Sequence, residues 1–416
     1  MTTKEILAAV ERCRTRAAAY LDAQRVETSD ALYWRHSPAH DPGTHPGHLL
    51  YGTWAGAMAS LAIGIDTRFT PDQRCRIANA LNGFQRDDGT FMLPGIPEEA
   101  RTGHDDEYLA FHCSNYALGA LRAIGEPPRY PLSFAVPFTD GPYLESWLAA
   151  RDWRRPWTEG NKIVNVASFL AMLADDGDGA ARERLIEMAD WHDAHQHRRT
   201  GFWHVDPADD WGALLQAMAG AAHVYHLYYY LGRDVPLADR IVESCLRLGY
   251  MGVRSACIDI DVVDILVHFR RYGHRLAEVD SILERYLVEL LQVQNPDNGF
   301  SDSYVSPHRL YGHCTPADQS VTWTTWFRLA TIGMICSALL PEERGRWRFR
   351  DTLGMGYCSL QYAMDGVPGA VGFGAHCRPR QRIMLTMRRE GRFARQRATL
   401  RARTWLAGAV PSGSGE

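Results

Sequence analysis

The stretch Gln85-Arg-Asp-Asp-Gly-Thr-Phe91 recurs in altered form along the chain, and this repetition indicates the fold. The related stretches are Gln196-His-Arg-Arg-Thr-Gly-Phe-Trp203, Gln294-Asn-Pro-Asp-Asn-Gly-Phe300 and, in degenerate form, Gln361-Tyr-Ala-Met-Asp-Gly366. Each follows a helical pattern. We expect the glycine to end the helix in a left-handed conformation, the glutamine amide to bond the turn backbone and the aromatic residue to pack on the next helix.

Between these turns, hydrophobic residues recur with helical spacing, and no segment shows the sustained alternation of a strand. The segments with helical spacing are 3–21, 51–63, 72–84, 109–124, 163–174, 180–192, 211–231, 237–248, 260–272, 278–293 and 321–340. The links between them are short and rich in glycine, proline and aspartate. The sequence therefore predicts an all-α fold built from helical hairpins.

Composition excludes several classes of protein. Of the 416 residues, 46% are hydrophobic and 23% are charged, which is typical of a globular chain and not of a disordered or collagenous one. No apolar run approaches the ~18 residues of a membrane span. The first residues are charged and lack the apolar core of a signal peptide, so we expect a cytoplasmic protein. Nine cysteines without a CxxC pair argue against a disulfide framework.

Charge divides the chain into an acidic body and a basic tail. Residues 377–416 hold ten arginines and two glutamates, whereas the whole chain has a formal net charge of −4. We therefore expect a domain at 1–376 followed by an arginine-rich tail at 377–416. An acidic body does not favour nucleic-acid binding. The tail is either solvated or a peripheral contact to the acidic body, to a membrane surface or to an anionic substrate.

The repeated glutamine–glycine–aromatic turns resemble the QW motifs of triterpene cyclases and the related turns of protein prenyltransferase β-subunits. The resemblance covers roughly residues 50–370. It implies an α/α toroid, in which inner helices surround a central cavity.

The segment Cys257-Ile-Asp-Ile-Asp-Val-Val-Asp-Ile-Leu-Val-His268 is similar to the DxDD motif of class II terpene cyclases. Asp259 and Asp261 match the first two aspartates of that motif. Val262 replaces its last aspartate, and Asp264 lies two residues further on. The resemblance implies that Asp261 is the general acid that protonates an alkene or an epoxide.

The same residues predict acid chemistry without the resemblance. Asp261, Asp264 and His268 share one helix face and lie among β-branched residues, with Asp259 as a helix N-cap. Burial and a second carboxylate raise the pKa of an acid, which then stays protonated at neutral pH, and a histidine can orient or reprotonate it. The alternative is a capped helix whose exposed acids pair with Arg254 or Arg270.

Other residues are candidates for binding a substrate. Glu159, Asn161 and Lys162 stand at the start of an apolar helix, where they either face a cavity or form a cap with a solvated lysine. Aromatic side chains are expected to line the cavity, since their faces stabilise carbocations and stack on sugar rings. The aromatic candidates are Tyr225, Trp323 and Trp326.

We expect no metal site in the protein and no certain cofactor, with Mg²⁺ required only if the substrate is a diphosphate. The histidine pairs His192/His195 and His223/His226 are more typical of helix packing than of zinc, because HExxH is absent. A zinc site joining His313-Cys314 to Cys257 or Asp259 is the weaker alternative, and the acidic stretch 104–107 is expected to form a surface turn.

Two functions in different classes follow, with a third in reserve. The first is a terpene cyclase-like enzyme that cyclises an isoprenoid by acid initiation. The second is a carbohydrate-active α/α barrel (a hydrolase, lyase or epimerase) that uses the same aspartates on a sugar. The third is a non-catalytic toroid that binds a lipid or a protein partner. The lining of the cavity distinguishes them.

Overall fold

The structure is a computed structural model, and it describes residues 2–64, 69–96, 100–101, 104–205, 210–304 and 306–347. The described part is mainly α-helical. Its α-helices are α1 (Thr3–Gln24), α2 (His48–Ala62), α3 (Pro71–Asn82), α4 (Asp106–Ile124), α5 (Gly141–Ala149), α6 (Pro156–Asp175), α7 (Gly179–His195), α8 (Trp211–Leu231), α9 (Ala238–Leu248), α10 (Ala256–Phe269), α11 (Leu276–Leu290) and α12 (Thr322–Leu339). The prediction of an all-α fold is confirmed.

Two short antiparallel hairpins accompany the helices. The first pairs β1 (Arg25–Glu27) with β2 (Leu32–Trp34), and the second pairs β3 (His308–Leu310) with β4 (His313–Thr315). The sequence did not predict these hairpins or α5, because strands of three residues and a helix of nine give too few periods to recognise. The predicted tail and the degenerate turn at 361–366 lie outside the described residues.

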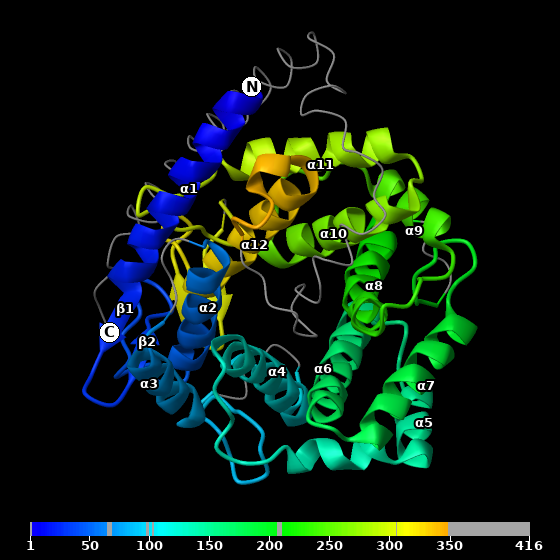
Figure 1. Ribbon diagram of the computed structural model, residues 1–416, viewed down its shortest axis with the longest axis horizontal. Coiled ribbons are helices and arrows are strands. Elements are labelled where there is room, and N and C mark those ends of the chain that lie inside the picture. Colours follow the sequence, from blue (N-terminus) through cyan, green and yellow to red (C-terminus); the bar gives the residue numbers. More distant parts are fainter. Residues whose placement is uncertain are drawn as a thin grey trace, which may run out of the picture.

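Alternate helices form an inner layer. Each of α2, α4, α6, α8, α10 and α12 packs against the next in this order, and α12 packs against α2 (Figure 1). The other long helices pack outside them; α7, for example, contacts α6 and α8. The α/α toroid stays a prediction, and this order of neighbours supports it.

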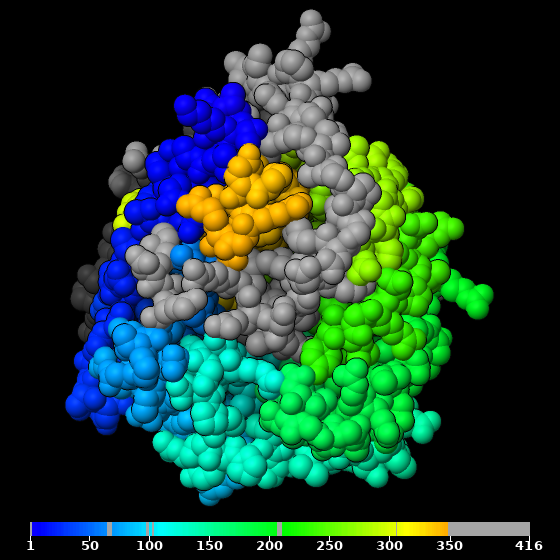
Figure 2. Space-filling view, viewed as in Figure 1, coloured from blue at the N-terminus to red at the C-terminus, as the bar shows by residue number. Residues whose placement is uncertain are grey.

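The two ends of the described chain meet. Helix α1 packs against both α2 and α12, and Arg346 Nη2 lies 2.7 Å from Glu11 Oε2. Figure 2 shows α1 in blue beside the orange end of α12 and the residues that follow it. The N-terminal helix therefore covers the junction at which α12 returns to α2.

The three described glutamine turns have the predicted structural role. In each turn the glutamine Nε2 donates a hydrogen bond to a backbone carbonyl further along the turn: Gln85 to Gly89, Gln196 to Gly201 and Gln294 to Asn298. A hydroxyl group from an inner helix also bonds each turn: Ser114 of α4 to Phe91 N, Tyr225 of α8 to Gly201 O and Thr325 of α12 to Phe300 N. The turns therefore fasten the outer layer to alternate inner helices.

The left-handed residue differs in the third turn. Gly89 and Gly201 have the predicted positive φ, of 92° and 77°, but Asn298 takes φ 76° in place of Gly299. The prediction that these glycines end the helices is wrong, because α3, α7 and α11 end five or more residues before them. Gly299 is needed for another reason, since a Cβ there would lie 2.6 Å from the Cβ of Ser320. Asparagine tolerates the left-handed region better than most residues, which explains the exchange.

Across the described residues, no helix is both long and apolar enough to cross a membrane. The helix pair α6 and α8 instead shows how closely the inner layer packs. A Cβ on Gly160 would lie 2.2 Å from the carbonyl oxygen of Gly220, and a Cβ on Gly220 would lie 2.2 Å from that of Pro156. Both contacts are with backbone, so side-chain rearrangement cannot relieve them.

We therefore predict that Gly220→Ala lowers the free energy of unfolding by about 3 kcal/mol, because α6 and α8 must move apart. Gly179→Ala is the matched control, since a Cβ at this helical position meets nothing within 4 Å. Urea denaturation followed by circular dichroism measures both variants. Equal stabilities would contradict the close packing of these two helices.

Candidate active site

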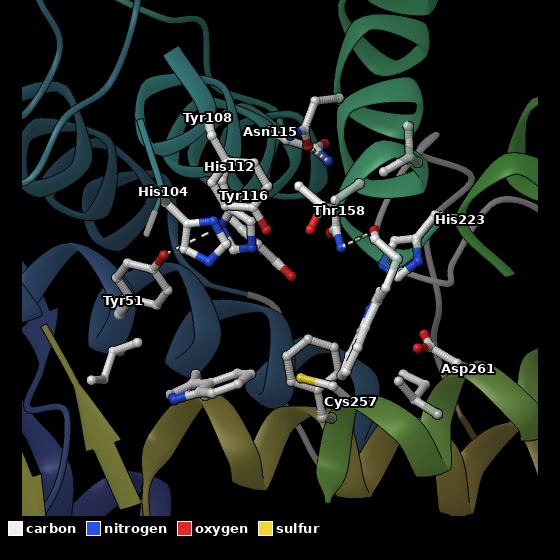
Figure 3. Close-up of a pocket in the computed structure, with 18 of the residues that line it drawn as sticks. Tyr51, His104, Tyr108, His112, Asn115, Tyr116, Thr158, His223, Cys257 and Asp261 are labelled. Atoms are coloured by element: carbon white, nitrogen blue, oxygen red, sulfur yellow. Dashed lines mark hydrogen bonds between the residues drawn. The ribbon is translucent and has the colours of Figure 1, made fainter. Parts of the chain in front are cut away.

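The inner helices surround a cavity of about 320 Å³. Its lining includes residues of all six inner helices and of the β3–β4 hairpin. The lining residues are Tyr51, His104, Tyr108, His112, Asn115, Tyr116, Trp157, Thr158, Asn161, Val164, Asn165, Gln216, His223, His226, Cys257, Ile260, Asp261, Asp264, Arg309, Leu310, Tyr311, Trp323 and Phe327. In Figure 3, Asp261 and Cys257 lie on the opposite side of the cavity from Tyr51 and His104. Aromatic and polar groups therefore share one space.

Helix α10 supplies all three aspartates and begins earlier than predicted. Its N-cap residue is Ser255, and the first backbone N–H, that of Ala256, donates to Asp302 Oδ1 at 2.8 Å. The prediction that Asp259 is the N-cap is wrong, because Asp302 satisfies the helix end from another segment. Asp259 lies inside the first turn of a helix that is buried almost throughout.

Asp259 forms a fully buried ion pair with Arg328 of α12. Its carboxylate also accepts the backbone N–H of Arg254 at 3.0 Å. Burial raises the pKa of Asp259 to about 6, although the guanidinium of Arg328 acts in the opposite direction. The side chain of Asp259 is not among those that line the cavity. It therefore joins α10 to α12 behind the cavity wall.

Asp261 lines the cavity, and its Oδ2 has no hydrogen-bond partner among the described residues. Burial, followed by the charges of Asp264 and Asp259, holds the pKa of Asp261 well above its ordinary value. This shift favours the protonated form of a carboxyl group that faces the cavity, so Asp261 is the candidate proton donor.

Asp264 has the opposite electrostatic environment. Its Oδ1 lies 3.2 Å from His268 Nδ1, and its Oδ2 lies 3.4 Å from His226 Nε2. Burial acts to raise the pKa of Asp264, but the two imidazoles outweigh it and hold the pKa below the ordinary value. The ring of His268 stacks on Tyr229 at 3.9 Å between centroids, which fixes its orientation. The pKa values of the two neighbouring carboxyls are therefore shifted in opposite directions, which favours the ionised form of Asp264 and the protonated form of Asp261.

The sequence missed the role of His226, which shares Asp264 with His268 across the α8–α10 interface. The predicted packing of His223 and His226 on α8 is correct, yet both rings also line the cavity. Burial and the neighbouring His226 lower the pKa of His223 to about 4. Because His223 Nδ1 lies 2.7 Å from the carbonyl oxygen of Ala219, its Nε2 carries the lone pair. In the sequence, only the i, i+3 spacing of His223 and His226 indicated that these two rings lie close together on α8.

The three predicted polar ligands of α6 separate in the structure. Asn161 lines the cavity and donates to the Trp157 carbonyl at 3.0 Å. Glu159 is buried with Arg151 at 3.1 Å and Lys162 at 3.6 Å, and neither Glu159 nor Lys162 is a lining residue. The ion pairs of Glu159 hold the two cations outside the cavity lining.

The predicted aromatic ligands separate in the same way. Trp323 lines the cavity, and its Nε1–H donates to His308 at 3.2 Å. Trp326, by contrast, is buried against Trp54 and Phe327. Tyr225 is buried beside the turn at Gly201, to which it donates its hydroxyl hydrogen. The cavity instead uses Tyr51, Tyr108, Tyr116, Trp157, Tyr311 and Phe327, which periodicity does not distinguish from core residues.

The weaker metal candidates separate too. Asp105 is the N-cap of α4, and Asp106 pairs with Arg101 on the surface, so the acidic stretch forms the start of a helix. As placed, no three His, Cys, Asp or Glu side chains of the described residues are arranged to hold a metal ion. A scan of protein-family models and a search of curated proteins found no match to this chain.

The opposite pKa shifts of Asp261 and Asp264 predict opposite effects on stability. The unfolded state loses the Asp261 proton near pH ~4 while the folded state keeps it, so stability falls as the pH rises. We expect Asp261→Asn to gain stability over the wild type between about pH 5 and pH 8, by up to ~1.4 kcal/mol per pH unit. Urea denaturation at several pH values measures this.

Asp264→Asn is the matched comparison. The lowered pKa of Asp264 gives stability that is present above the ordinary carboxyl pKa and is lost as the pH falls through the folded value. The variant should therefore be less stable than the wild type at neutral pH and approach it in acid. If both variants show the same dependence on pH, the assignment of one protonated and one ionised carboxyl is wrong.

The buried pair of Asp259 and Arg328 predicts strong coupling between α10 and α12. Arg328→Met should lower the free energy of unfolding by about 3–5 kcal/mol, because it leaves Asp259 buried without its cation. Adding Asp259→Asn to this variant should recover part of the loss, and urea denaturation of the four proteins measures the coupling. Additive losses would contradict the ion pair.

Proposed function

We propose that this protein is a terpene cyclase-like enzyme that cyclises an isoprenoid after Asp261 protonates it. The observation that carries the proposal is a buried carboxyl with a raised pKa and an unpartnered oxygen in a cavity lined by aromatic rings. The mechanism has three parts: a proton donor, walls that stabilise a cation, and a fixed negative charge that keeps the donor protonated before substrate binds.

The proton donor acts on a carbon–carbon double bond or an epoxide. Transfer of the Asp261 proton forms a new C–H or O–H bond and leaves a carbocation facing the Asp261 carboxylate. A carboxyl with a raised pKa is a weak acid in its resting state, so the acceptor must gain stability elsewhere. An epoxide is the more basic acceptor, and opening its ring assists the step. We therefore favour an epoxide at the reacting end.

Aromatic walls supply stabilisation of the cation. Tyr116, Trp323 and Phe327 line the cavity with Asp261, and Trp323 and Phe327 meet edge to face at 5.0 Å between centroids. The negative face of an aromatic ring attracts a cation by about 2 kcal/mol or more when both are desolvated. Such rings stabilise each carbocation along a cyclisation without reacting with it.

Asp264 is a positioning residue in this proposal. Its negative charge keeps the proton on Asp261 until the substrate enters, and His226 and His268 hold Asp264 in place. His223 also lines the cavity, and because burial lowers its pKa to about 4, its neutral imidazole is a base for removing the final proton. The acid and the base would then stand in one cavity.

The size and the polar groups of the cavity bear on the substrate. A volume of about 320 Å³ is at the low end for small-molecule sites, which favours a short isoprenoid. Arg309 is exposed and lines the cavity, where it suits an anionic end group. A diphosphate would bring Mg²⁺ as part of the substrate, and no described cluster of protein ligands is arranged for that ion.

One observation favours the second candidate, a carbohydrate-active enzyme. Asn115 and Asn165 bond each other at 2.9 Å in the cavity wall, which leaves Asn115 Oδ1 and Asn165 Nδ2 without partners among the described residues. A hydroxylated ligand would satisfy both atoms. Against it, Asp261 and Asp264 lie on one helix face instead of on opposite sides of a scissile bond.

The test is a product assay by mass spectrometry. The purified wild-type chain is incubated with farnesyl diphosphate, geranylgeranyl diphosphate, squalene and their terminal epoxides, with Mg²⁺ present. We expect a cyclised product from at least one short substrate, and a loss of at least ~100-fold in rate in Asp261→Asn. Asp176→Asn, which changes an exposed aspartate, is the control and should keep full activity.

Two outcomes would contradict the proposal. Cyclisation that persists in Asp261→Asn would remove Asp261 from the mechanism. The second outcome is that the wild type converts none of the isoprenoids but does convert a glycoside or an acidic sugar, and that Asp261→Asn abolishes this activity. The same aspartates would then act in a carbohydrate-active enzyme.

A further inference from the structure

Six of the 17 histidines in the chain gather at one place outside the cavity. Three come from the segment between β2 and α2, one is the first residue of α2, and two come from the β3–β4 hairpin. They are His36, His40, His45, His48, His308 and His313, which we call the histidine cluster. Neighbouring rings in it lie 5.2–6.3 Å apart between centroids.

The histidine cluster lies where the inner layer closes. His48 is the first residue of α2, and the His36 carbonyl accepts the backbone N–H of Thr322, the first residue of α12, at 2.8 Å. The hairpin reaches the same place, because His48 Nε2 lies 2.7 Å from the carbonyl oxygen of Leu310. Three segments distant in sequence therefore meet at these rings.

The ring spacing fits a tetrahedral metal ion. With a metal–nitrogen distance of about 2.05 Å and a tetrahedral angle, two ligating imidazoles have centroids about 5.2 Å apart. The observed distances are 5.3 Å for His36–His48, 5.5 Å for His36–His313 and 5.4 Å for His48–His313. All three pairs lie within a few tenths of an ångström of the requirement.

Hydrogen bonds decide which rings have a free lone pair. His48 donates its Nε2–H to the Leu310 carbonyl, so its Nδ1 carries the lone pair. This is the usual outer contact of a ligating histidine. The Nε2 of His313 lies 3.3 Å from Ser37 Oγ, and a ligating Nδ1 requires that Nε2 donates its hydrogen to this hydroxyl oxygen. His36 is fully buried, and neither of its ring nitrogens has a hydrogen-bond partner among the described residues.

Two other rings are fixed in supporting positions. His40 uses both nitrogens, since Nδ1 accepts the His36 backbone N–H at 3.0 Å and Nε2 contacts the His45 carbonyl at 2.9 Å. His308 Nε2 accepts the Trp323 indole N–H at 3.2 Å, so its hydrogen is on Nδ1. These rings hold the loop and the hairpin in place and are not ligands. His45 stands at the rim, 5.2 Å from His313 between centroids.

We propose that His36, His48 and His313 bind one zinc-class divalent ion, which fastens the β3–β4 hairpin to the start of α2. Neutral imidazole ligands suit Zn²⁺, Cu²⁺ and Ni²⁺, whereas Mg²⁺ and Ca²⁺ need oxygen ligands. Among these, Zn²⁺ accepts tetrahedral geometry without preference from its d electrons. The fourth position is open to water or to His45.

The rings must turn before they bind the ion. In the conformation described, no three His, Cys, Asp or Glu side chains are arranged to hold a metal. The centroids are already in place, so the change needed is rotation of the rings about their own bonds, for which the histidine χ2 energy surface is broad. His36 loses no hydrogen bond in turning, whereas His48 and His313 turn only as far as their contacts to Leu310 and Ser37 allow. Rotation also gives one of the two unpartnered nitrogens of His36 a partner, which offsets part of the energy of burying them unpaired.

The ion would position one wall of the cavity. Arg309, Leu310 and Tyr311 belong to the hairpin that carries His308 and His313, and all three line the cavity. A metal bridge from His313 to His48 holds this wall against α2. The proposed ion therefore acts structurally, at a distance from Asp261, and does not depend on the proposed function.

The test measures metal content and affinity in tag-free protein. The wild-type chain is stripped with a chelator, dialysed against Zn²⁺ and analysed by plasma mass spectrometry, and Co²⁺ is substituted to read the geometry from its visible bands. We expect one ion per chain, tetrahedral Co²⁺ bands and a Zn²⁺-dependent rise in melting temperature. His36→Gln and His313→Gln should each weaken binding by roughly 100-fold.

Three controls make the result decisive. His195→Gln changes an exposed histidine on α7 and should bind like the wild type. His45→Gln should change affinity by less than about tenfold, because His45 replaces only the open position. Circular dichroism of the variants confirms that they fold. Wild-type protein that takes up no more Zn²⁺ than His36→Gln, or full binding by folded His36→Gln, would overturn the proposal.

Discussion

The burial of three carboxyl groups on α10 is the constraint on which the contacts of this helix with its neighbours depend. Three carboxyl groups lie within two turns of a helix that is buried almost throughout, and an isolated charge there would be strongly unfavourable. Each carboxyl is stabilised differently. Asp259 pairs with Arg328 of α12, Asp264 faces two histidines, and the raised pKa of Asp261 favours its uncharged form. The helices on either side of α10 are therefore tied to it by charge as well as by packing.

The same constraint directs chemistry to one carboxyl. Arg328 pairs with Asp259 behind the cavity wall and two imidazoles face Asp264, whereas Asp261 presents an oxygen without a hydrogen-bond partner among the described residues to the cavity. A protonated acid beside an ionised one is the arrangement in which neighbouring carboxyls take separate roles. The glutamine turns fasten the outer helices to the inner helices. The junction of α2 with α12, beside the histidine cluster, closes the inner layer.

The sequence predicted the helices well because each long helix has several periods of hydrophobic spacing. It predicted the glutamine bonds of the turns, and it singled out the helix with the acids. It did not predict that Asp302 would cap that helix, nor that Tyr225 would bond a turn instead of lining the cavity, since these contacts join distant segments. The partner of Asp259 was missed for the same reason, because Arg328 is 69 residues away.

The central claim is that Asp261 is protonated at neutral pH in the cavity. Infrared difference spectroscopy between wild type and Asp261→Asn, recorded from acid to neutral pH, observes the carbonyl stretch of a protonated carboxyl directly. The structure predicts a protonated-carboxyl band at neutral pH that the variant lacks. If the wild-type and variant spectra coincide at neutral pH and differ only below about pH 4, Asp261 titrates as an ordinary carboxyl, and the account is wrong.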